Sequence, residues 1–431
     1  MKRYNEYKDS GVKWIGEIPR HWECRKLKTL LLSPLQYGAN ASGVPYSEHL
    51  PRYIRITDIT LEGKLKHSDK LSLSNEDAAK YILKDKDILF ARSGASVGKT
   101  FLYKKEYGLS AFAGYLIKAE LGKELIPELL FYFTQSDIYE SWKNGIFIQS
   151  TIQNIGADKY SQLQIAIPPL PEQEAIVTYL DSKVAKIDEY ISIAEKKIAA
   201  LEELKQTIIA EAVTRGIHKE VPMKDSGVKW IGMIPEHWKV MRLSQIAYEH
   251  FISNKKIHHQ NLLSLSYGQI IRKDINGTNG LLPASFDTYQ VVEEGNIILR
   301  LTDLQNDHKS LRVGLVKETG IITSAYLCLA PKNMVYSKFL YFQLHACDIK
   351  KVFYSMGDGL RQSLNYDGMR KLASVIPPLL EQQEIVNYIE AKVANINQLC
   401  QAERSQIEKL KGYKQRLISD VVTGKVKVTN D

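Results

Sequence analysis

Residues Asp9–Gly16 read Asp-Ser-Gly-Val-Lys-Trp-Ile-Gly, and the same eight residues return unchanged at Asp225–Gly232. An Ile-Pro pair and a His-Trp pair follow each copy at matching positions. Such an exact repeat in a chain of 431 residues indicates a tandem duplication, because chance rarely preserves eight residues in order. We therefore expect one structural unit to be used twice.

A second pair of matching blocks extends the duplication along the chain. Ile167–Leu170 and Ile376–Leu379 both read Ile-Pro-Pro-Leu, and a Glu-Gln pair follows each copy. The first blocks are offset by 216 positions and the second by 209, so the variable segments between them differ in length. The chain therefore divides into four parts, which are residues 1–166, 167–216, 217–375 and 376–431.

Each Pro-Pro block precedes a stretch that we predict to be a long helix, over Glu172–Thr214 and Glu381–Thr423, since proline is well tolerated at a helix start. Apolar residues in both stretches alternate in steps of three and four, the pattern of a coiled-coil seam. The seams share one register, which predicts antiparallel packing of two rods of roughly 60–65 Å at about 1.5 Å per residue. The seam comprises Val184, Ile187, Ile191, Ile198, Leu201 and Ile208 in the first helix, and Val393, Ile396, Ile407, Leu410, Leu417 and Val421 in the second. Seven residues added after Leu201 and after Leu410 should keep this register and lengthen both rods.

The variable segments, residues 23–165 and 239–374, are typical of mixed α/β domains. Each holds short β-type runs followed by a helical stretch, Pro127–Trp142 or Ser337–Phe353. The predicted strands are Tyr53–Ile56, Asp87–Phe90 and Tyr115–Ile117 in the first segment, and Leu262–Leu265, Asn296–Leu299 and Ala325–Cys328 in the second. We predict an α/β (α+β) fold with two such domains separated by the antiparallel helices, related by a pseudo-twofold axis.

The repeated Asp-Ser-Gly block, the Pro-Pro-Leu-x-Glu-Gln block and the closing stretch Leu417–Val426 resemble the specificity subunit of type I restriction-modification systems, over the whole chain. The resemblance implies that residues 1–166 and 217–375 are target-recognition domains, each reading one half of a split, asymmetric site in double-stranded DNA. It implies that the helices set the distance between the halves and dock two methyltransferase (modification) subunits, which restriction (helicase-nuclease) subunits join later. We expect the apolar residues Ile176, Tyr179, Ile385 and Tyr388 to be exposed docking points near the helix starts.

Composition agrees with a DNA-binding protein of the cytoplasm. The net charge of +9 suits a polyanionic partner, although basic proteins without nucleic-acid partners are common. The polar start Met1–Glu6 argues against a secretory signal, and no apolar run approaches the roughly 20 residues that span a bilayer. The four cysteines lie far apart and without zinc-finger spacing, so we interpret them as reduced structural thiols.

Three motifs look catalytic, and we expect none of them to be so. Gly94–Thr100 resembles a phosphate-binding loop but has three residues between its glycines where that loop needs four; a DNA-facing loop or a plain turn is favoured. Ile167–Leu170 lacks the polar acceptor and the aromatic ring of an adenine methyltransferase loop and is better interpreted as a strand-to-helix junction. Glu62-Gly63-Lys64 is too short to specify a nuclease site. We expect no catalytic residue, no cofactor and no metal. A self-sufficient methyltransferase or nuclease, and a repressor or structural coiled-coil protein without enzyme partners, remain the alternatives.

Candidate DNA contacts come from basic residues of the variable segments. Arginine can read guanine with two hydrogen bonds, whereas lysine more often anchors to phosphate. The repeated residues Trp14, Trp22, Trp230 and Trp238 could stack on DNA, but their identity in modules of different sequence favours a structural joint. The candidates are Arg55, Arg92, Ser96, Lys99, Lys104 and Lys105 in the first segment, and Lys255, Lys256, Arg272, Lys273, Arg300 and Arg312 in the second.

Overall fold

The computed structural model describes residues 2–60, 63–66, 68–147, 153–218, 220–275, 283, 285–304, 311–356 and 363–428. The chain forms two compact units. Unit 1 comprises Met1–Ala194 and Ser405–Asp431, and unit 2 comprises Glu195–Arg404. Both long helices are therefore divided between the units, so each unit contains part of each helix. The following paragraphs describe each unit by itself.

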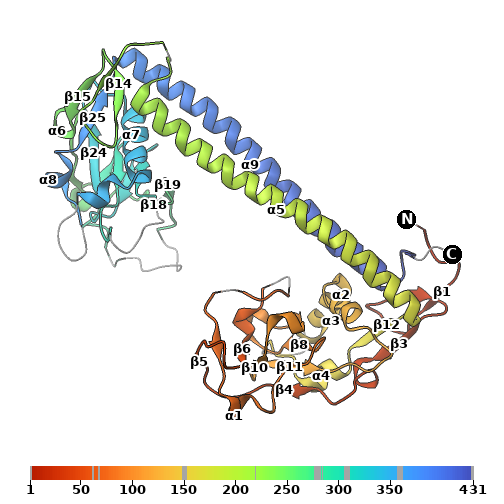
Figure 1. The fold of residues 1–431 in the computed structure, drawn as a ribbon. Coiled ribbons are helices and arrows are strands. Elements are labelled where there is room, and N and C mark those ends of the chain that lie inside the picture. Colours follow the sequence, from red (N-terminus) through yellow and green to blue (C-terminus); the bar gives the residue numbers. More distant parts are fainter. Residues whose placement is uncertain are drawn as a thin grey trace. The chain divides into compact units, whose positions relative to one another are not determined.

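In its described part, unit 1 holds two four-stranded sheets, ordered β4-β11-β8-β9 and β10-β6-β7-β5 (Figure 1). Their strands are β4 Gln36–Tyr37, β5 Val44–Pro45, β6 Arg52–Ile54, β7 Leu71–Ser72, β8 Ile88–Ala91, β9 Thr100–Leu102, β10 Ser110–Phe112 and β11 Leu116–Ala119. Alternation along β8 divides its side chains between two cores, as the strand period of two requires. Ile88 and Phe90 join the large core cluster that contains Phe133 and Tyr139, whereas Leu89 joins a second cluster. This buried strand therefore ties the two sides of the unit together.

Unit 2 repeats this plan. Its sheets are ordered β16-β24-β21-β22, β17-β20-β23 and β18-β19. Ile297 and Leu299 of β21 enter one core cluster and Ile298 enters another. The strands are β16 Ala247–Glu249, β17 Ile252–Ser253, β18 Leu263–Ser266, β19 Gln269–Arg272, β20 Gln290–Val292, β21 Ile297–Leu299, β22 Val313–Leu315, β23 Gly320–Ile322 and β24 Leu327–Pro331. The equivalence of β8 and β21 supports one fold used twice.

The predicted domain helices differ between the units. Pro127–Trp142 is not one helix, because α2 ends at Phe133 and α3 begins at Asp137. Ser136 makes the break: its hydroxyl donates to the Phe133 carbonyl at 2.6 Å and accepts from the Tyr139 amide at 3.3 Å. Such local side-chain bonds compete with helix hydrogen bonds. In unit 2, α7 runs without a break over Ser337–Ile349 and is followed by the 3-10 turn Val352–Ser355.

The long helices are α5, Leu170–Arg215 with 46 residues, and α9, Leu379–Val422 with 44. They pack antiparallel within each unit (Figure 1), because residues later in α5 meet residues earlier in α9. Asp188 pairs with Lys414 at 2.6 Å in unit 1, and Lys205 bonds Asn397 at 3.3 Å in unit 2. Of the seam residues, Ile187, Ile396, Ile407, Leu417 and Val421 are buried, and the other seven are half-buried.

Antiparallel pairing corrects the predicted insertion points. Lys197–Glu403 and Lys205–Asn397 bracket Leu201, so the residue opposite Leu201 is Cys400. Leu410 is equivalent to Leu201 in sequence but does not face it. Two insertions that lengthen the pair evenly must therefore follow Leu201 and Leu399.

The repeated sequence blocks meet in a structural joint, which each unit contains once. In unit 1, β3 Glu23–Lys26 pairs with β12 Gln164–Ile167, and Pro168-Pro169 then leads directly into α5. In unit 2, β15 Lys239–Arg242 pairs with β25 Ala373–Ile376 ahead of α9. The predicted strand-to-helix junction at the Pro-Pro steps is thus confirmed.

Tryptophan and glutamate hold each joint. Trp22 has none of its surface exposed, and its Nε1 donates to Glu172, which His21 also contacts at 2.9 Å. Trp238 and Glu381 repeat this arrangement in unit 2.

A glutamine in each joint bonds three backbone groups. The side chain of Gln173 accepts from the Ile126 amide at 2.9 Å and donates to the Glu124 and Pro168 carbonyls at 2.9 Å. Gln382 makes the equivalent bonds with Tyr336, Met334 and Pro377.

The end of the other helix completes each joint. Gly424, beyond the end of α9, has a φ of +73° and lies against Pro19 and Trp22. Gly216, beyond the end of α5, has a φ of +75° and lies against Trp238. A positive φ combined with this close approach favours glycine at both places. The duplicated blocks therefore encode one joint that is built twice.

Candidate nucleic-acid interface

The loop Arg92–Lys99 connects two antiparallel strands, since Phe90 of β8 pairs with Thr100 of β9. It contains the short 3-10 turn Gly94–Ser96 and leads into a strand. A phosphate-binding loop instead leads into a helix, whose N-terminal amides contribute to holding the phosphate. The resemblance of Gly94–Thr100 to a nucleotide site is therefore superficial.

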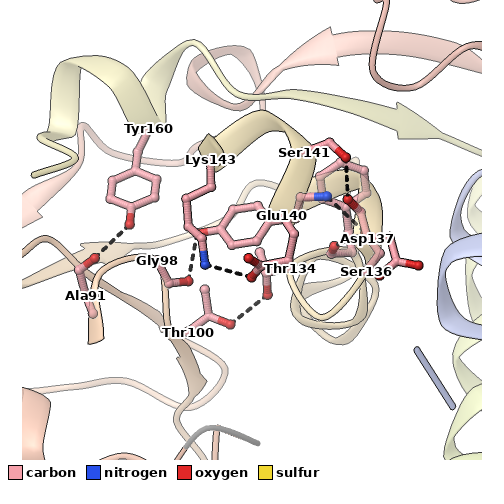
Figure 2. Close-up of polar contacts among 12 residues, drawn as sticks. Ala91, Gly98, Thr100, Thr134, Ser136, Asp137, Glu140, Ser141, Lys143 and Tyr160 are labelled. Atoms are coloured by element: carbon pink, nitrogen blue, oxygen red, sulfur yellow. Dashed lines mark hydrogen bonds and ion pairs between the residues drawn. The ribbon is translucent and has the colours of Figure 1, made fainter. Parts of the chain in front are cut away.

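Buried tyrosines anchor this loop from behind. The hydroxyl of Tyr139 donates to the Gly98 carbonyl at 2.9 Å. The hydroxyl of Tyr160 donates to the Ala91 carbonyl at 2.8 Å (Figure 2). Burial raises the pKa of both phenols, so both remain donors at neutral pH. Lys143 covers Gly98, where an added Cβ would lie 2.3 Å from the lysine Cδ. Hydrogen bonds and side-chain packing therefore hold the loop in place.

An arginine and two tyrosines form the surface beside this loop. The Arg92 guanidinium lies 5.0 Å from the centre of the Tyr37 ring. Its Nε is buried and has no hydrogen-bond partner among the described residues. The Arg92 amide donates to the carbonyl of Tyr115, whose side chain is 62% exposed. Stacked guanidinium and phenol groups suit contacts with bases and phosphates. The sequence prediction missed Tyr37 of β4 and Tyr115 of the turn before β11, because the sequence does not reveal whether a tyrosine in or beside a strand faces solvent.

The other candidates of unit 1 lie in different settings. Ser96 and Lys99 are half-buried on the loop, and Lys104 and Lys105 are exposed beyond the other end of β9. Arg55 is engaged inside the protein: it bonds Asp58 at 2.7 Å and the Asp69 carbonyl at 2.8 Å. The bond to Asp58 raises the pKa of Arg55. Arg55 therefore supports the turn that follows β6.

In unit 2, Lys255 and Lys256 are exposed in the 3-10 turn Asn254–Lys256. Arg272 and Lys273 are exposed at the end of β19. The Arg272 side chain forms an ion pair with Glu318, which raises the pKa of the arginine and lowers that of the glutamate. The exposed lysines are therefore better placed than Arg272 to anchor phosphate.

Arg300 follows β21 directly and Arg312 directly precedes β22, the strand that pairs with β21. Arg300 is half-buried, and Arg312 has none of its surface exposed. The Arg312 guanidinium donates to the Arg300 carbonyl at 3.1 Å and the Thr302 carbonyl at 2.9 Å. These bonds assign Arg312 to the core of unit 2, so it must be withdrawn from the DNA-contact candidates.

Further features of the chain concern the nuclease-like motif, metal binding, membrane spanning and the thiols. Glu62, part of the Glu62-Gly63-Lys64 motif, lies outside the described residues. Among the residues that the structure describes, no three His, Cys, Asp or Glu side chains gather so as to hold a metal ion. Within the same residues, no helix is both long and apolar enough to cross a membrane. Burial raises the pKa of the free thiol of Cys328 to about 12, which makes it unreactive.

The amino-acid sequence is similar to those of known DNA specificity proteins. Residues 53–203 match the family described as the type I restriction modification DNA specificity domain. The putative type I restriction enzyme MjaX specificity subunit of Methanocaldococcus jannaschii is 26% identical over 447 residues, covering 98% of each chain.

Two solved structures share the fold. One is a chain from a study of the structural basis of complex assembly and conformational transition of the type I R-M system, with a TM-score of 0.69, 16% identity, and coverage of 95% of this chain and 99% of that one. The other is the HsdS subunit from Thermoanaerobacter tengcongensis, with a TM-score of 0.50, 18% identity, and coverage of 95% and 98%. Residues 53–203 thus match the DNA specificity domain of type I restriction-modification systems, and the whole chain is similar to their specificity subunits, which are non-catalytic subunits that recognise DNA sequence.

Proposed function

We propose that units 1 and 2 each read one half of a split, asymmetric DNA site. One observation carries this proposal: the two units share a fold but have different side chains at equivalent positions. When β8 is aligned with β21, Arg92 of unit 1 corresponds to Leu301 of unit 2, which is buried. Two modules with the same fold but different exposed groups should recognise different base sequences, so the two half-sites should differ.

Exposed lysines supply the electrostatic part of binding in this proposal. Lys104 and Lys105 in unit 1, and Lys255, Lys256 and Lys273 in unit 2, contact phosphates and set the register of each module. Arg92, with Ser96 and Lys99 on the anchored loop, reads bases for unit 1. Arg55, Arg272 and Arg300 have weaker claims, because the first two are held by carboxylates and the third is half-buried.

The test is an exchange of one variable segment. Residues 23–165 are replaced by the matching segment of a relative, and methylated adenines are mapped in the host genome by single-molecule sequencing. We expect one half of the methylated site to change and the other to remain. A change in both halves would mean that the units are not independent readers.

We further propose that two modification subunits bind, one to each unit, and that restriction subunits join this assembly in the cytoplasm. The docking residues differ from those that the sequence predicts. Ile176 and Ile385 have none of their surface exposed and belong to the core clusters. Tyr179 is half-buried and Tyr388 is exposed. The predicted docking points are therefore wrong for the two isoleucines.

Four exposed apolar residues of the helices form two pairs that are equivalent under the duplication. Tyr190 and Leu204 of α5 correspond to Leu399 and Tyr413 of α9 under the shift of 209 residues. Positions 14 residues apart lie close to four helical turns apart, so they share a face at about 3.6 residues per turn. Unit 1 carries Tyr190 and Tyr413, and unit 2 carries Leu204 and Leu399. Each unit thus offers a matching apolar surface to one copy of the same partner.

Native mass spectrometry tests this stoichiometry. The wild-type chain should bind two modification subunits, and the double variant Leu204→Glu with Leu399→Glu should bind one. The matched control replaces the exposed Lys196 and Glu408 of the same helices with alanine and should still bind two. A stable one-to-one complex of the wild-type chain under saturating partner would contradict the proposal.

A further inference from the structure

A two-stranded hairpin projects an unusual residue in unit 2. Strands β18 and β19 pair antiparallel, and Tyr267 and Gly268 form the turn between them. Both turn residues have positive φ, +45° for Tyr267 and +77° for Gly268. Such turns favour Asn or Asp before Gly, because an aromatic side chain is strained in the left-handed region. Tyr267 is nevertheless 83% exposed at the tip. Packing of the Tyr267 ring within the protein therefore does not offset the strain of its backbone.

One face of the hairpin is firmly mounted. Leu263, Leu265 and Ile270 pack in a core cluster with Val316. At Gly314 an added Cβ would lie 2.6 Å from Leu265 and 2.8 Å from Ile270, so the hairpin approaches β22 closely. The tip is held too, since Gly268 lies against Leu311. The hairpin is thus a rigid support for its exposed tip.

The opposite face carries hydrogen-bonding groups and one exposed isoleucine, Ile271, which pairs with Ser264. Ser264 and Ser266 are half-buried there, and Gln269, which pairs with Ser266 across the strands, is exposed. The exposed Lys273 follows directly after β19. The hairpin is therefore a rigid ribbon with hydroxyl and amide groups on one face, an aromatic residue at its tip and a cation at its base. These are the features of an element that reads DNA. The major groove, about 12 Å wide, admits a two-stranded ribbon.

We propose that the β18-β19 hairpin is the element with which unit 2 enters the major groove of its half-site, and that the Tyr267 ring packs against the bases there. This inference rests on the proposed function and assigns a specificity-determining residue to it. In unit 1, β6 occupies the position of the segment before β18, as its parallel pairing with β10 matches that of Leu262 with Ile321. The chain there enters a 3-10 turn whose Asp58 is buried against Arg55. The tyrosine contact therefore belongs to one half-site.

Two substitutions distinguish the effect of losing the Tyr267 ring from the effect of disturbing the turn. Tyr267→Asn removes the ring and keeps a residue that tolerates positive φ, so the hairpin remains folded. Tyr267→Phe keeps the ring. Each variant, assembled with its modification subunits, methylates genomic DNA from a strain that lacks the system, and methylated adenines are mapped by sequencing. We expect Tyr267→Asn to slow methylation about ten-fold, the size of one lost base contact, and to relax base preference in one half-site only. Tyr267→Phe should stay within about two-fold of the wild type.

Salt dependence tests the kind of contact. Binding to a duplex carrying the mapped site is measured at several salt concentrations. Because tyrosine is uncharged, Tyr267→Asn should weaken binding by the same factor at each concentration and leave the slope of log K against log salt unchanged. Lys255→Ala, the matched control, should reduce that slope by about 0.9 if it removes one phosphate contact.

The outcomes are distinguishable. Wild-type methylation of the split site combined with an unchanged Tyr267→Asn variant would overturn this inference and leave the proposed function standing. Failure of the wild-type complex to methylate any split site would overturn the proposed function itself. Loss of modification-subunit binding by Tyr267→Asn, seen by native mass spectrometry, would assign the hairpin to a protein contact and also overturn the inference.

Discussion

The indole Nε1 of Trp22 donates a hydrogen bond of 3.0 Å to the carboxylate of Glu172, and Trp238 makes a bond of the same length to Glu381. The first pair lies 150 residues apart in the chain. Each glutamate sits in the first turn of a long helix, where a negative charge also interacts favourably with the helix dipole. The bond therefore fixes the start of each helix to the domain that precedes it.

Removing this carboxylate should destabilise unit 1. Glu172→Ala leaves the buried indole N–H of Trp22 without its acceptor, at a cost of about 1–3 kcal/mol in the free energy of unfolding. Calorimetry should show a lower melting temperature for the variant. Glu174→Ala changes an exposed glutamate of the same helix turn and serves as the control. Equal melting temperatures for both variants would contradict the role given to the joint.

The tyrosine behind the candidate DNA loop gives a second prediction. Tyr139→Phe removes the bond to the Gly98 carbonyl and should lower the free energy of unfolding by about 1–2 kcal/mol. The loosened loop should also slow methylation, since Arg92 and Ser96 lose their rigid support. Tyr81→Phe is the control, because Tyr81 packs in other core clusters of the unit. Normal methylation kinetics for Tyr139→Phe would show that the loop needs no such support.

The third prediction concerns the spacer helices. Seven residues inserted after Leu201 and seven after Leu399 preserve the seam and lengthen the pair by about 10 Å. At about 3.4 Å per base pair, the gap between the half-sites should grow by up to roughly three base pairs, with both half-site sequences unchanged. Methylome sequencing measures the gap. An insertion after Leu201 alone breaks the pairing and should abolish methylation; an active double insertion with an unchanged gap would mean that the helices do not measure DNA.

A buried histidine predicts acid sensitivity of unit 2. Burial, with a further contribution from Lys205, lowers the pKa of His345 to about 4, while its Nε2 bonds Gln206 at 2.9 Å. The unfolded chain binds a proton near pH 6.5 and the folded chain does not, so stability is complete above pH 6.5 and falls as the pH decreases toward 4. The loss should approach about 1.4 kcal/mol per pH unit.

Chemical unfolding at pH 7 and pH 5 measures this loss. His345→Gln keeps a partner for Gln206 and should remove most of the difference between the two pH values. His258→Gln changes an exposed histidine of the same unit and should retain it. The same pH dependence in all three proteins would place the acid-sensitive group elsewhere.

The sequence by itself determined the duplication, the two long helices and the resemblance to a known family, because these rest on patterns that are local in the chain. Exact repeated blocks, Pro-Pro helix starts and apolar residues in steps of three and four need no knowledge of distant contacts. The helix break at Ser136 was missed, since the serine ends α2 by bonding Phe133 and the sequence pattern continues through it.

Only the tertiary structure decided which groups are available for binding. Arg312 looks like other basic residues in sequence, yet backbone carbonyls bind its guanidinium inside unit 2, whereas Tyr267 looks like a strand residue and stands exposed at a turn. The structure also decided that Leu201 faces Cys400 and not Leu410. Burial and helix opposition depend on atoms brought together from remote parts of the chain, and a linear pattern does not contain those distances.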